Sequence, residues 1–574
     1  MRAFINRIIN NKILMIGAMI IIIAIVTCFP FLKGGIYGFN KDVIYHLFRI
    51  DGLADCIVNG QLPSRIYNNF FDGYGYGSPM FYPDILMLPA ALLRIIGVSL
   101  SMTYKLYVLL ITVIATITTY YSAKVIIKDF RLAVVATYMI MLSQFYLANI
   151  MSRAGLSEYL GYIFLPLVFA GIYDFFKNDG KRVYLLGIGF GGMILSHTLL
   201  AFLGGIVTAG FFIVGIICDI VSKQLSKRGH QYIKLIITAV LTLLIVGFYL
   251  FPMIEQLLSV EMGVNTPWTF VGNNTQPLYT LFIVNGYFEM IAYVGIGIPL
   301  LILMGARVFY ARVKNAWSDA FYFGGIALFI VTTNIIPWYL CNNTFLNSIQ
   351  FTFRWYPYAI FALTVGSLMI IDSAAQSKDM NNIITRIVIV FVALSIAFGS
   401  WENLFTMSRV EKPDFHTDIN TIDMTTTYEV GEGREWLPVK ANDVYLSWSS
   451  DDKVRSGNTD VLCTRQSGEV VFNTIPSATE YVCTLTYYKG YKAKLTDSNG
   501  QVYDLKVTES DTGQVQVIND LSVDGEVRVY YGNTFVQIIS LIISIITILA
   551  VVIYIVLSKR GIFVGKSYKK DQVK

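Results

Sequence analysis

An acid, an imidazole and a guanidinium follow one another near the N-terminus, at Asp42, His46 and Arg49 of KDVIYHLFRIDGL. Residues with this spacing share one face of an α-helix, and we expect a helix over 41–59. The neighbouring cation keeps the Asp42 carboxyl ionised, so that it can act as a general base or bind a divalent metal. Arg49 can bind a phosphate through two parallel hydrogen bonds. A solvated helix face with a local ion pair is the alternative interpretation.

A stretch rich in glycine, tyrosine and proline follows this helix, from Gln61 to Pro83, and it includes Arg65 as a further candidate for binding substrate. Its glycines imply a tight and irregular backbone. Its aromatic side chains suit either the membrane interface or a platform on which a sugar ring stacks. A plain interfacial loop is equally compatible with this composition.

Three later positions also carry candidate groups. Arg153 and Glu158 are five residues apart, so a direct pair on one helix is not expected, but both can face a common cleft with Asp42. The alternative is a short polar turn. His197 begins a new apolar segment with no acid near it in sequence, which favours a packing role and argues against a hydrolase triad. Arg354 lies amid aromatic residues in QFTFRWY, where it can hold a phosphate or anchor a helix end by snorkelling.

The composition indicates what must position these groups. Of 574 residues, 55% are hydrophobic and 14% charged, whereas a soluble domain averages about 25% charged. Residues 402–534 hold 21 of the 38 acidic and 12 of the 44 basic residues, a net charge of −9, and the remainder carries +15. This pattern excludes a simple soluble enzyme, a disordered protein and a nucleic-acid binder. It describes an apolar membrane body with one polar, acidic module.

Apolar segments long enough to cross a bilayer number twelve. The first is too long for the apolar core of a signal peptide and lacks a cleavage site, so it is expected to be an uncleaved span. Residues 84–98 are apolar but interrupted, and we expect an interfacial helix there. The twelve segments lie near 13–32, 102–123, 131–148, 158–176, 183–200, 200–220, 232–252, 291–309, 319–337, 355–374, 386–401 and 535–557.

Lysine and arginine in the short loops set the orientation. With twelve spans, all the basic loops fall on one side, which the positive-inside rule assigns to the cytoplasm together with both termini. The long first loop 33–101 and the module 402–534 then face the opposite side. The basic segments are the N-terminus, 124–131, 177–182, 223–228, 307–314 and the tail from Lys559.

The module 402–534 alternates polar and apolar residues, a pattern typical of strands. Turns are expected at 497–500 and 511–513, and an antiparallel sheet or sandwich should result. Cys463 and Cys483 both fall in it and can form a disulfide if the module is extracytoplasmic. The expected strands are VYLSW (444–448), EVVF (469–472), YVCTLTYY (481–488), VYDLKV (502–507), QVQVI (514–518) and EVRVYYG (526–532).

Several of these stretches resemble one bacterial membrane-protein family. FNKDVIYHLFRIDGLADCIVNGQLPSRI with YGYGSPMFYP resembles its opening, ILSHTLLA and IQFTFRWYPYAI its later motifs, and GEGREWLPVK with TYYKGYKAKL its C-terminal β region. The family is labelled 6-pyruvoyl-tetrahydropterin synthase-related and is similar to YfhO-like proteins and GT-C glycosyltransferases. The label does not imply pterin chemistry.

The resemblance implies a GT-C-like architecture in the bacterial cell membrane. The domains would be 1–401 (multi-span), 402–534 (β-rich) and 535–574 (last span and basic tail). It also implies transfer of a sugar from a polyprenyl-phosphate donor to a cell-envelope glycan on the outer face. Asp42 matches the acidic residue of the first outer loop that acts as base or metal ligand. Asp42 stands alone rather than in an acidic pair, so dependence on a divalent metal (Mg or Mn) stays open.

Two alternatives remain. Twelve spans also suit a flippase for a lipid-linked glycan, although few charges lie at mid-span, where transport sites need polar groups. A non-catalytic scaffold for envelope assembly is the third interpretation.

Overall fold

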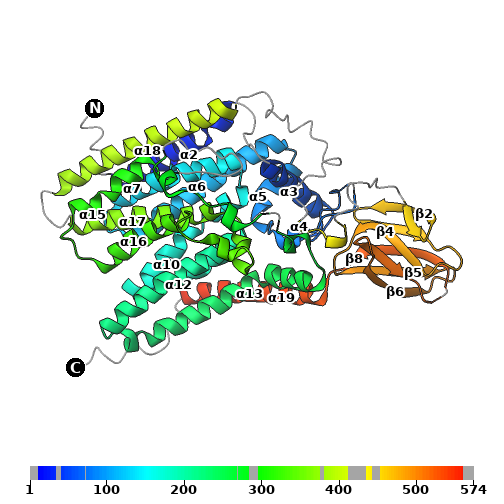
Figure 1. Cartoon of the computed structure of the whole chain (residues 1–574). Helices are drawn as coiled ribbons and strands as arrows, with labels where there is room; N and C mark the ends of the chain where they lie inside the picture. Colours follow the sequence, from blue (N-terminus) through cyan, green and yellow to red (C-terminus); the bar gives the residue numbers. More distant parts are fainter. Residues whose placement is uncertain are drawn as a thin grey trace.

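The computed structural model describes residues 11–33, 41–71, 73–267, 269–283, 295–374, 380–410, 435–441, 453–521 and 523–559. Most of the chain forms a helical body, and a β-barrel lies at one end of it (Figure 1). Helices α3 (Lys41–Val58) and α4 (Ser78–Phe81) lie at the junction between the two parts. The first long loop, which contains α3 and α4, therefore meets the C-terminal β-barrel at this end of the body.

The helices of the body differ widely in length, and several are interrupted by 3-10 or π turns. The longest are α2 (Lys12–Lys33), α6 (Leu100–Ile126), α12 (Thr198–Val221), α13 (Gly229–Ser259), α17 (Tyr356–Ala374), α18 (Met380–Val410) and α19 (Phe535–Lys559). The shorter ones are α5 (Leu88–Ile95), α7 (Phe130–Met141), α8 (Gln144–Ala148), α9 (Leu156–Gly161), α10 (Leu165–Lys177), α11 (Tyr184–Ile194), α14 (Ile298–Met304), α15 (Ala306–Phe309) and α16 (Ala316–Val331).

Eight helices of the described chain are long and apolar enough to cross a membrane, or nine if the pair 130–141 and 144–153, bent by 43°, counts as one span. The count of twelve is therefore not confirmed. Three predicted spans contain only shorter apolar helices, at 184–194, 298–309 and 316–331. Crossing about 30 Å of hydrocarbon takes about 20 helical residues. Within the hydrocarbon layer, irregular backbone is tolerated only where the protein buries it. Apolar composition does not distinguish such backbone from helix, so the predicted helices at these three positions were too long.

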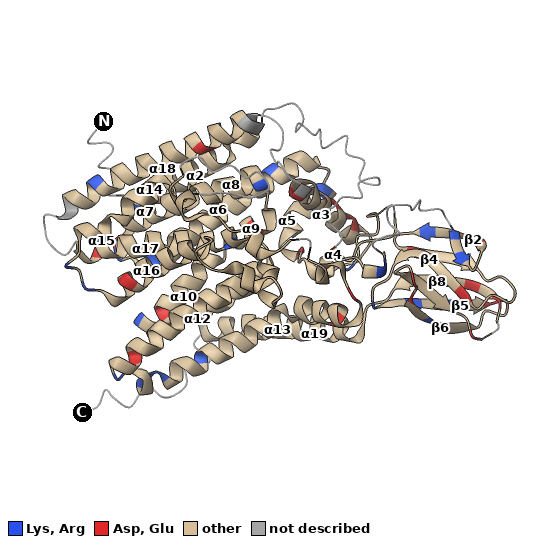
Figure 2. Cartoon of the chain, in the orientation of Figure 1, with Lys and Arg blue, Asp and Glu red and all other residues tan. Residues whose placement is uncertain are grey.

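Four of the predicted basic loops gather at the end of the body away from the barrel, where Figure 2 shows charged segments. The backbone amides of Lys128 and Asp129 donate to the Asp372 carboxylate at the end of α17. This agrees with the prediction that these loops share one side; the cytoplasmic assignment stays a prediction. The loops also carry ion pairs: Arg131–Asp129 (2.6 Å), Arg182–Asp174 (3.2 Å), Arg228–Asp219 (2.6 Å) and Arg307–Asp319 (3.0 Å).

The first long loop contains both predicted helices. The helix expected over 41–59 is α3, and the one expected over 84–98 is a 3-10 turn at Ile85–Met87 continued by α5. Arg94 of α5 donates from Nε to Asp51 of α3 at 2.6 Å, which ties the two helices together. α5 buries Ala90 and Ala91 and exposes its other face, as an interfacial helix would.

The strands of the C-terminal module pair antiparallel, as expected, but the sheet closes into a barrel, which was not predicted. β3 pairs with β8 and β1 pairs with β4, and these pairings between distant strands close it in the order β1-β2-β3-β8-β5-β6-β7-β4. Closure removes exposed sheet edges. The strands are β1 (Lys453–Ser456), β2 (Thr459–Gln466), β3 (Glu469–Asn473), β4 (Glu480–Thr486), β5 (Tyr491–Asp497), β6 (Val502–Glu509), β7 (Gln514–Ile518) and β8 (Gly525–Tyr531).

Five of the six expected strands are present as β3, β4, β6, β7 and β8, while VYLSW lies outside the described residues. The turn at 497–500 is confirmed, because Asp497 Oδ1 accepts from the amides of Asn499 (2.9 Å) and Gln501 (2.8 Å). The turn at 511–513 is confirmed too, and Gly513 there has a φ of +68°, a conformation that favours glycine.

The two cysteines of the module lie in β2 and β4, with β1 between these strands. Cys463 and Cys483 are both buried. Burial raises the pKa of the Cys483 thiol, and the nearby Cys463 adds to this shift. The structure contains no bond between their sulfurs, so the disulfide considered from the sequence is not present in it.

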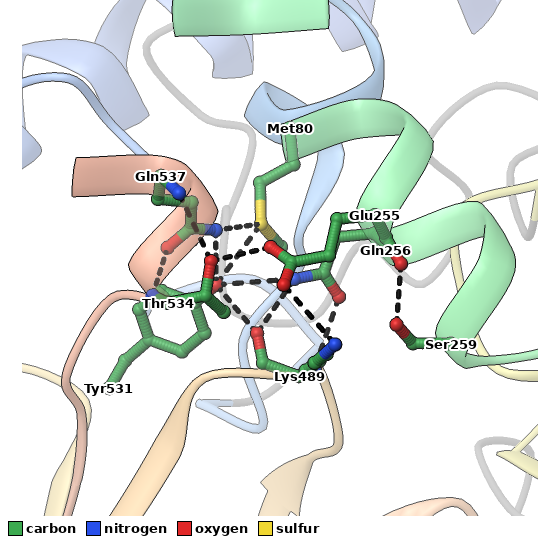
Figure 3. Close-up of polar contacts among 8 residues, drawn as sticks. All are labelled: Met80, Glu255, Gln256, Ser259, Lys489, Tyr531, Thr534 and Gln537. Carbon is green, nitrogen blue, oxygen red and sulfur yellow. Dashed lines mark hydrogen bonds and ion pairs between the residues drawn. The ribbon is translucent and has the colours of Figure 1, made fainter. Parts of the chain in front are cut away.

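The barrel is fixed to the body through α13 and α19, which pack antiparallel (Figure 3). The Gln256 amide of α13 donates to the Lys489 carbonyl (2.6 Å) and accepts from the Lys489 amide (3.0 Å). On α19, Gln537 donates to the Tyr531 hydroxyl at 2.7 Å, and that hydroxyl donates to the Lys489 carbonyl at 3.0 Å. An ion pair of 3.2 Å joins Glu255 to the Lys489 ammonium. The 489–490 turn of the barrel is thus bonded to both helices.

Replacing Gln256 by Ala should loosen this junction while leaving the barrel intact. The change removes both bonds to the Lys489 backbone and leaves the part-buried Lys489 amide with no other acceptor among the described residues, at a cost of about 1 kcal/mol. Amide hydrogen exchange should speed up around residue 489 and at the end of α13 but not in β7. Exchange that stays at wild-type rates at both places would show that the network does not hold the barrel. An alanine at the exposed Gln501 is the matched control.

Candidate functional site

α3 places the three N-terminal candidates on one face, as predicted. Asp42 is in its first turn and half-buried, while His46 and Arg49 are 3% and 0% exposed. The guanidinium of Arg49 lies 3.3 Å from His46 Nδ1. The predicted helix face is therefore real, but it is turned into the protein rather than toward solvent.

Arg49 is held by several groups of the protein through its Nη atoms, whereas its buried Nε has no hydrogen-bond partner. It donates to the Ser157 hydroxyl (2.8 Å) and to the carbonyls of Tyr82 (3.3 Å) and Pro83 (2.6 Å). Its guanidinium also lies 4.5 Å from the centre of the Tyr82 ring. A role as phosphate ligand stays a prediction for Arg49, whose Nη donors bind the loop at 82–83 and α9 in this conformation. Arg49 positions these elements around α3.

Arg153 and Glu158 form a direct ion pair, against the expectation from their spacing. The chain does not stay on one helix between them. A π turn over Asn149–Arg153 is followed by Ala154 with a φ of +56°, and α9 then starts in a new direction. This reversal brings the two side chains together. Glu158 is 2% exposed, and its Oε1 has no hydrogen-bond partner.

Arg354 joins the same place from the start of α17. Its Nη1 donates to the Ile349 carbonyl (2.5 Å) and to Gln350 Oε1 (3.0 Å), and its Nε has no partner. The Arg153 guanidinium lies 5.0 Å from the ring centre of the adjacent Phe353. The negative charge of Asp42 interacts electrostatically with the guanidinium groups of Arg153 and Arg354. Three sequence-distant segments thus bring Asp42, the pair Arg153–Glu158 and Arg354 within electrostatic range of one another.

His197 caps α12, because its Nδ1 accepts from the Leu200 amide at 3.1 Å. Burial lowers its pKa to about 3; the Glu158 carboxylate opposes this shift and nearby guanidinium groups add to it. Burial, then Arg49, also lowers the pKa of His46. Both imidazoles are therefore neutral at physiological pH. The ring of Tyr82 lies between them, with centroid distances of 6.3 Å to His46 and 5.7 Å to His197.

A neutral buried His197 predicts acid sensitivity. Its folded pKa is below the unfolded value, so the stability it contributes is complete above about pH 6.5 and is lost as the pH falls toward 3. Between pH 6.5 and 5 this amounts to about 2 kcal/mol. His197→Asn keeps a capping oxygen and should flatten the dependence of thermal stability on pH. The exposed His230→Asn is the control; equal slopes in both variants would refute the assignment.

Sequence reasoning missed three residues of this region. Tyr82 was noted only as part of an aromatic stretch, yet it contacts Arg49 and both histidines. Ser157 accepts from Arg49. Asp84 is buried and accepts from the hydroxyls of Ser64 and Tyr67, and burial raises its pKa. A Tyr-Pro-Asp run in a Gly-rich loop and a Ser before Glu158 were the available signals.

Arg65 lies on another side of this loop. Burial lowers the pKa of the Arg65 guanidinium, and two ionisable groups, Tyr531 of the barrel and Asp84, oppose this shift. Its neighbour Ile66 packs into the hydrophobic core of the barrel. The structure therefore places Arg65 at the barrel junction, apart from Arg153 and Arg354.

We define the polar cluster as Asp42, His46, Arg49, Tyr82, Arg153, Glu158, His197 and Arg354. With both imidazoles neutral, its three guanidinium groups and two carboxylates leave an excess of one positive charge. Three buried polar atoms of the cluster, Arg49 Nε, Glu158 Oε1 and Arg354 Nε, have no partner, and such atoms are rare unless a ligand or water satisfies them. Within the described residues, no three His, Cys, Asp or Glu side chains lie close enough to hold a metal ion. The cluster therefore fits an anionic, hydroxyl-bearing ligand and does not form a ready-made metal centre.

No protein-family model matches the chain, so the resemblance named above is not confirmed. An uncharacterized protein of Lactococcus lactis subsp. cremoris (strain MG1363) is 24% identical over 337 residues, which cover 56% of this chain and 53% of that protein. The chain thus spans about half the length of this relative.

Among solved structures, two cryo-EM structures of the arabinofuranosyltransferase AftD from Mycobacteria, one of them a mutant, are similar at 11% identity. The TM-scores are 0.42 and 0.39, over 67% of this chain and 27% of AftD. These values are too low to assign a family. What the apolar helices and the strand pairing support is a multi-pass membrane protein with a C-terminal β-barrel and a buried polar cluster at the barrel-side end.

Proposed function

We propose that this chain is a GT-C-type membrane glycosyltransferase, which transfers a sugar from a polyprenyl-phosphate donor to a cell-envelope glycan on the outer face of the bacterial membrane. The single observation that carries the proposal is the convergence of Asp42 with Arg153, Glu158 and Arg354 at one end of the helical body. A carboxylate beside two guanidinium groups is the arrangement that sugar transfer from a phosphate requires.

Each group has one task in this reaction. Asp42 takes the proton from the acceptor hydroxyl as the oxygen attacks the anomeric carbon of the donor. The bond from that carbon to the phosphate oxygen breaks, and the lipid phosphate leaves on the opposite face, so the configuration inverts. Arg153 and Arg354 hold the phosphate, whose charge rises as the bond breaks. Glu158 keeps Arg153 in place.

The charges of the cluster support an anionic donor. Three guanidinium groups face two carboxylates, so the site attracts a phosphate without neutralising the Asp42 base. The apolar helices around the cluster suit a long isoprenoid chain, which can approach from the bilayer while its phosphate reaches the end of the helical body. Cytoplasmic termini, predicted from the basic loops, would put the cluster on the outer side.

The test compares cell-envelope glycans by mass spectrometry between cells with the protein, cells without it and cells with Asp42→Asn. One sugar substituent should disappear in both altered strains. Identical glycans in all three would refute the proposal. A lipid-linked sugar that moves across vesicles containing the purified protein without being transferred would instead establish a flippase.

A further inference from the structure

A short strap of the C-terminal module, residues 435–439, reaches back from the barrel to the first loop. It runs beside the chain that follows α13, where the amides of Val264 and Gly263 donate to the carbonyls of Glu435 and Leu437, both at 2.8 Å. The Tyr488 hydroxyl at the end of β4 donates to the Trp436 carbonyl at 2.9 Å. Both the body and the barrel therefore hold the strap in one position.

The strap places an indole beside the polar cluster. Trp436 stacks flat on Phe81, with 4.9 Å between ring centres and 2° between planes. Phe81 is 2% exposed, and its carbonyl accepts from the Tyr249 hydroxyl at 2.6 Å. The next residue is Tyr82 of the polar cluster. Trp436 is partly exposed and also packs against the hydrophobic cores of the body and the barrel, so its ring is held in place while part of the side chain stays open to solvent.

A carboxylate accompanies the indole. Glu435 is partly exposed, and its charge acts on Tyr45 and Tyr76. Tyr45 precedes His46, and its hydroxyl lies 2.6 Å from the Ser78 hydroxyl. Glu435 therefore lies within electrostatic range of Tyr45 and Tyr76 of the first loop.

The barrel interior is filled, so it does not offer a second site. Its inward side chains include Tyr481, Leu495 and Val517, all fully buried, and an eight-stranded barrel of this size is packed by such side chains. What the module brings to the polar cluster is the strap.

We propose that Trp436 and Glu435 form the subsite for the acceptor, a neutral carbohydrate whose ring packs on the indole while its hydroxyls donate to the carboxylate. This inference rests on the proposed function. An aromatic face paired with one carboxylate combines apolar contact area with two strong acceptors. Neither group suits a phosphate, which the guanidinium groups of the polar cluster attract.

The experiment measures acceptor use and donor binding separately. Trp436→Ala and Glu435→Gln are assayed in cells for the sugar substituent of the envelope glycan. The same purified full-length variants in nanodiscs are assayed for binding of undecaprenyl phosphate. The substituent should fall about tenfold in each variant, while the Kd for undecaprenyl phosphate stays within about twofold of wild type. Trp436→Tyr keeps a stacking ring and should restore most of the transfer.

Trp401→Ala is the matched control, since Trp401 also stacks on a phenylalanine and is 38% exposed, but on α18. A parallel loss of undecaprenyl phosphate binding would overturn the inference, because the strap would then contact the donor. Unchanged glycans in Trp436→Ala and Glu435→Gln would overturn it as well. Failure of the proposed function differs from both outcomes, since glycans would then be unchanged in Asp42→Asn too.

Discussion

Sugar transfer should fall about a thousandfold when Asp42 is replaced by Asn, with little change in stability. The amide cannot accept the proton of the acceptor hydroxyl, and a positioned general base contributes about 10² to 10⁴ in rate. Asp42 is half-buried in the first turn of α3, so the isosteric change disturbs little packing. The measurement is the amount of the transferred sugar in envelope glycans, at matched protein levels.

Asp55→Asn is the matched control, because Asp55 lies on the same helix, where its Oδ2 accepts from Asn69 at 2.9 Å. Asp42→Asn with normal transfer would remove Asp42 from the reaction. If Asp55→Asn lowered transfer equally, the loss would reflect the charge of α3 rather than one proton acceptor.

Replacing Arg49 by Met should destabilise the protein by about 3 to 5 kcal/mol, the cost of removing a buried charged group from its hydrogen-bond partners. Arg49 is completely buried and joins α3, the 82–83 loop and α9. Met fills similar volume but leaves the Pro83 carbonyl and the Ser157 hydroxyl without their donor. Unfolding in mixed detergent micelles measures the change.

Arg94→Met is the comparison, since Arg94 is about one-quarter exposed and bonds α5 to α3; it should cost under about 1 kcal/mol. Arg354→Met should instead weaken binding of undecaprenyl phosphate. A stable Arg49→Met protein that has lost this binding would assign Arg49 the role of phosphate ligand.

Patterns local in sequence predicted much of the framework. The helix 41–59, eight of the twelve spans, five strands and two turns follow from apolar periodicity and turn residues, which act within short windows. The three shortened helices did not follow, because a buried irregular segment is as apolar as a lipid-exposed span. Closure of the barrel did not follow either, since β1–β4 and β3–β8 join distant strands.

For the candidate site, the sequence by itself determined which residues carry charge and that they flank apolar segments. Asp42, Arg153, Glu158 and Arg354 were all identifiable from that placement. Only the tertiary structure decided how they combine. The reversal at Ala154 pairs Arg153 with Glu158, and bonds to distant acceptors make Arg49 a support for the 82–83 loop and α9. The physical reason is that charge and apolarity belong to single residues, whereas burial and hydrogen-bond partners depend on chain segments more than a hundred residues apart, such as Arg49 and Ser157.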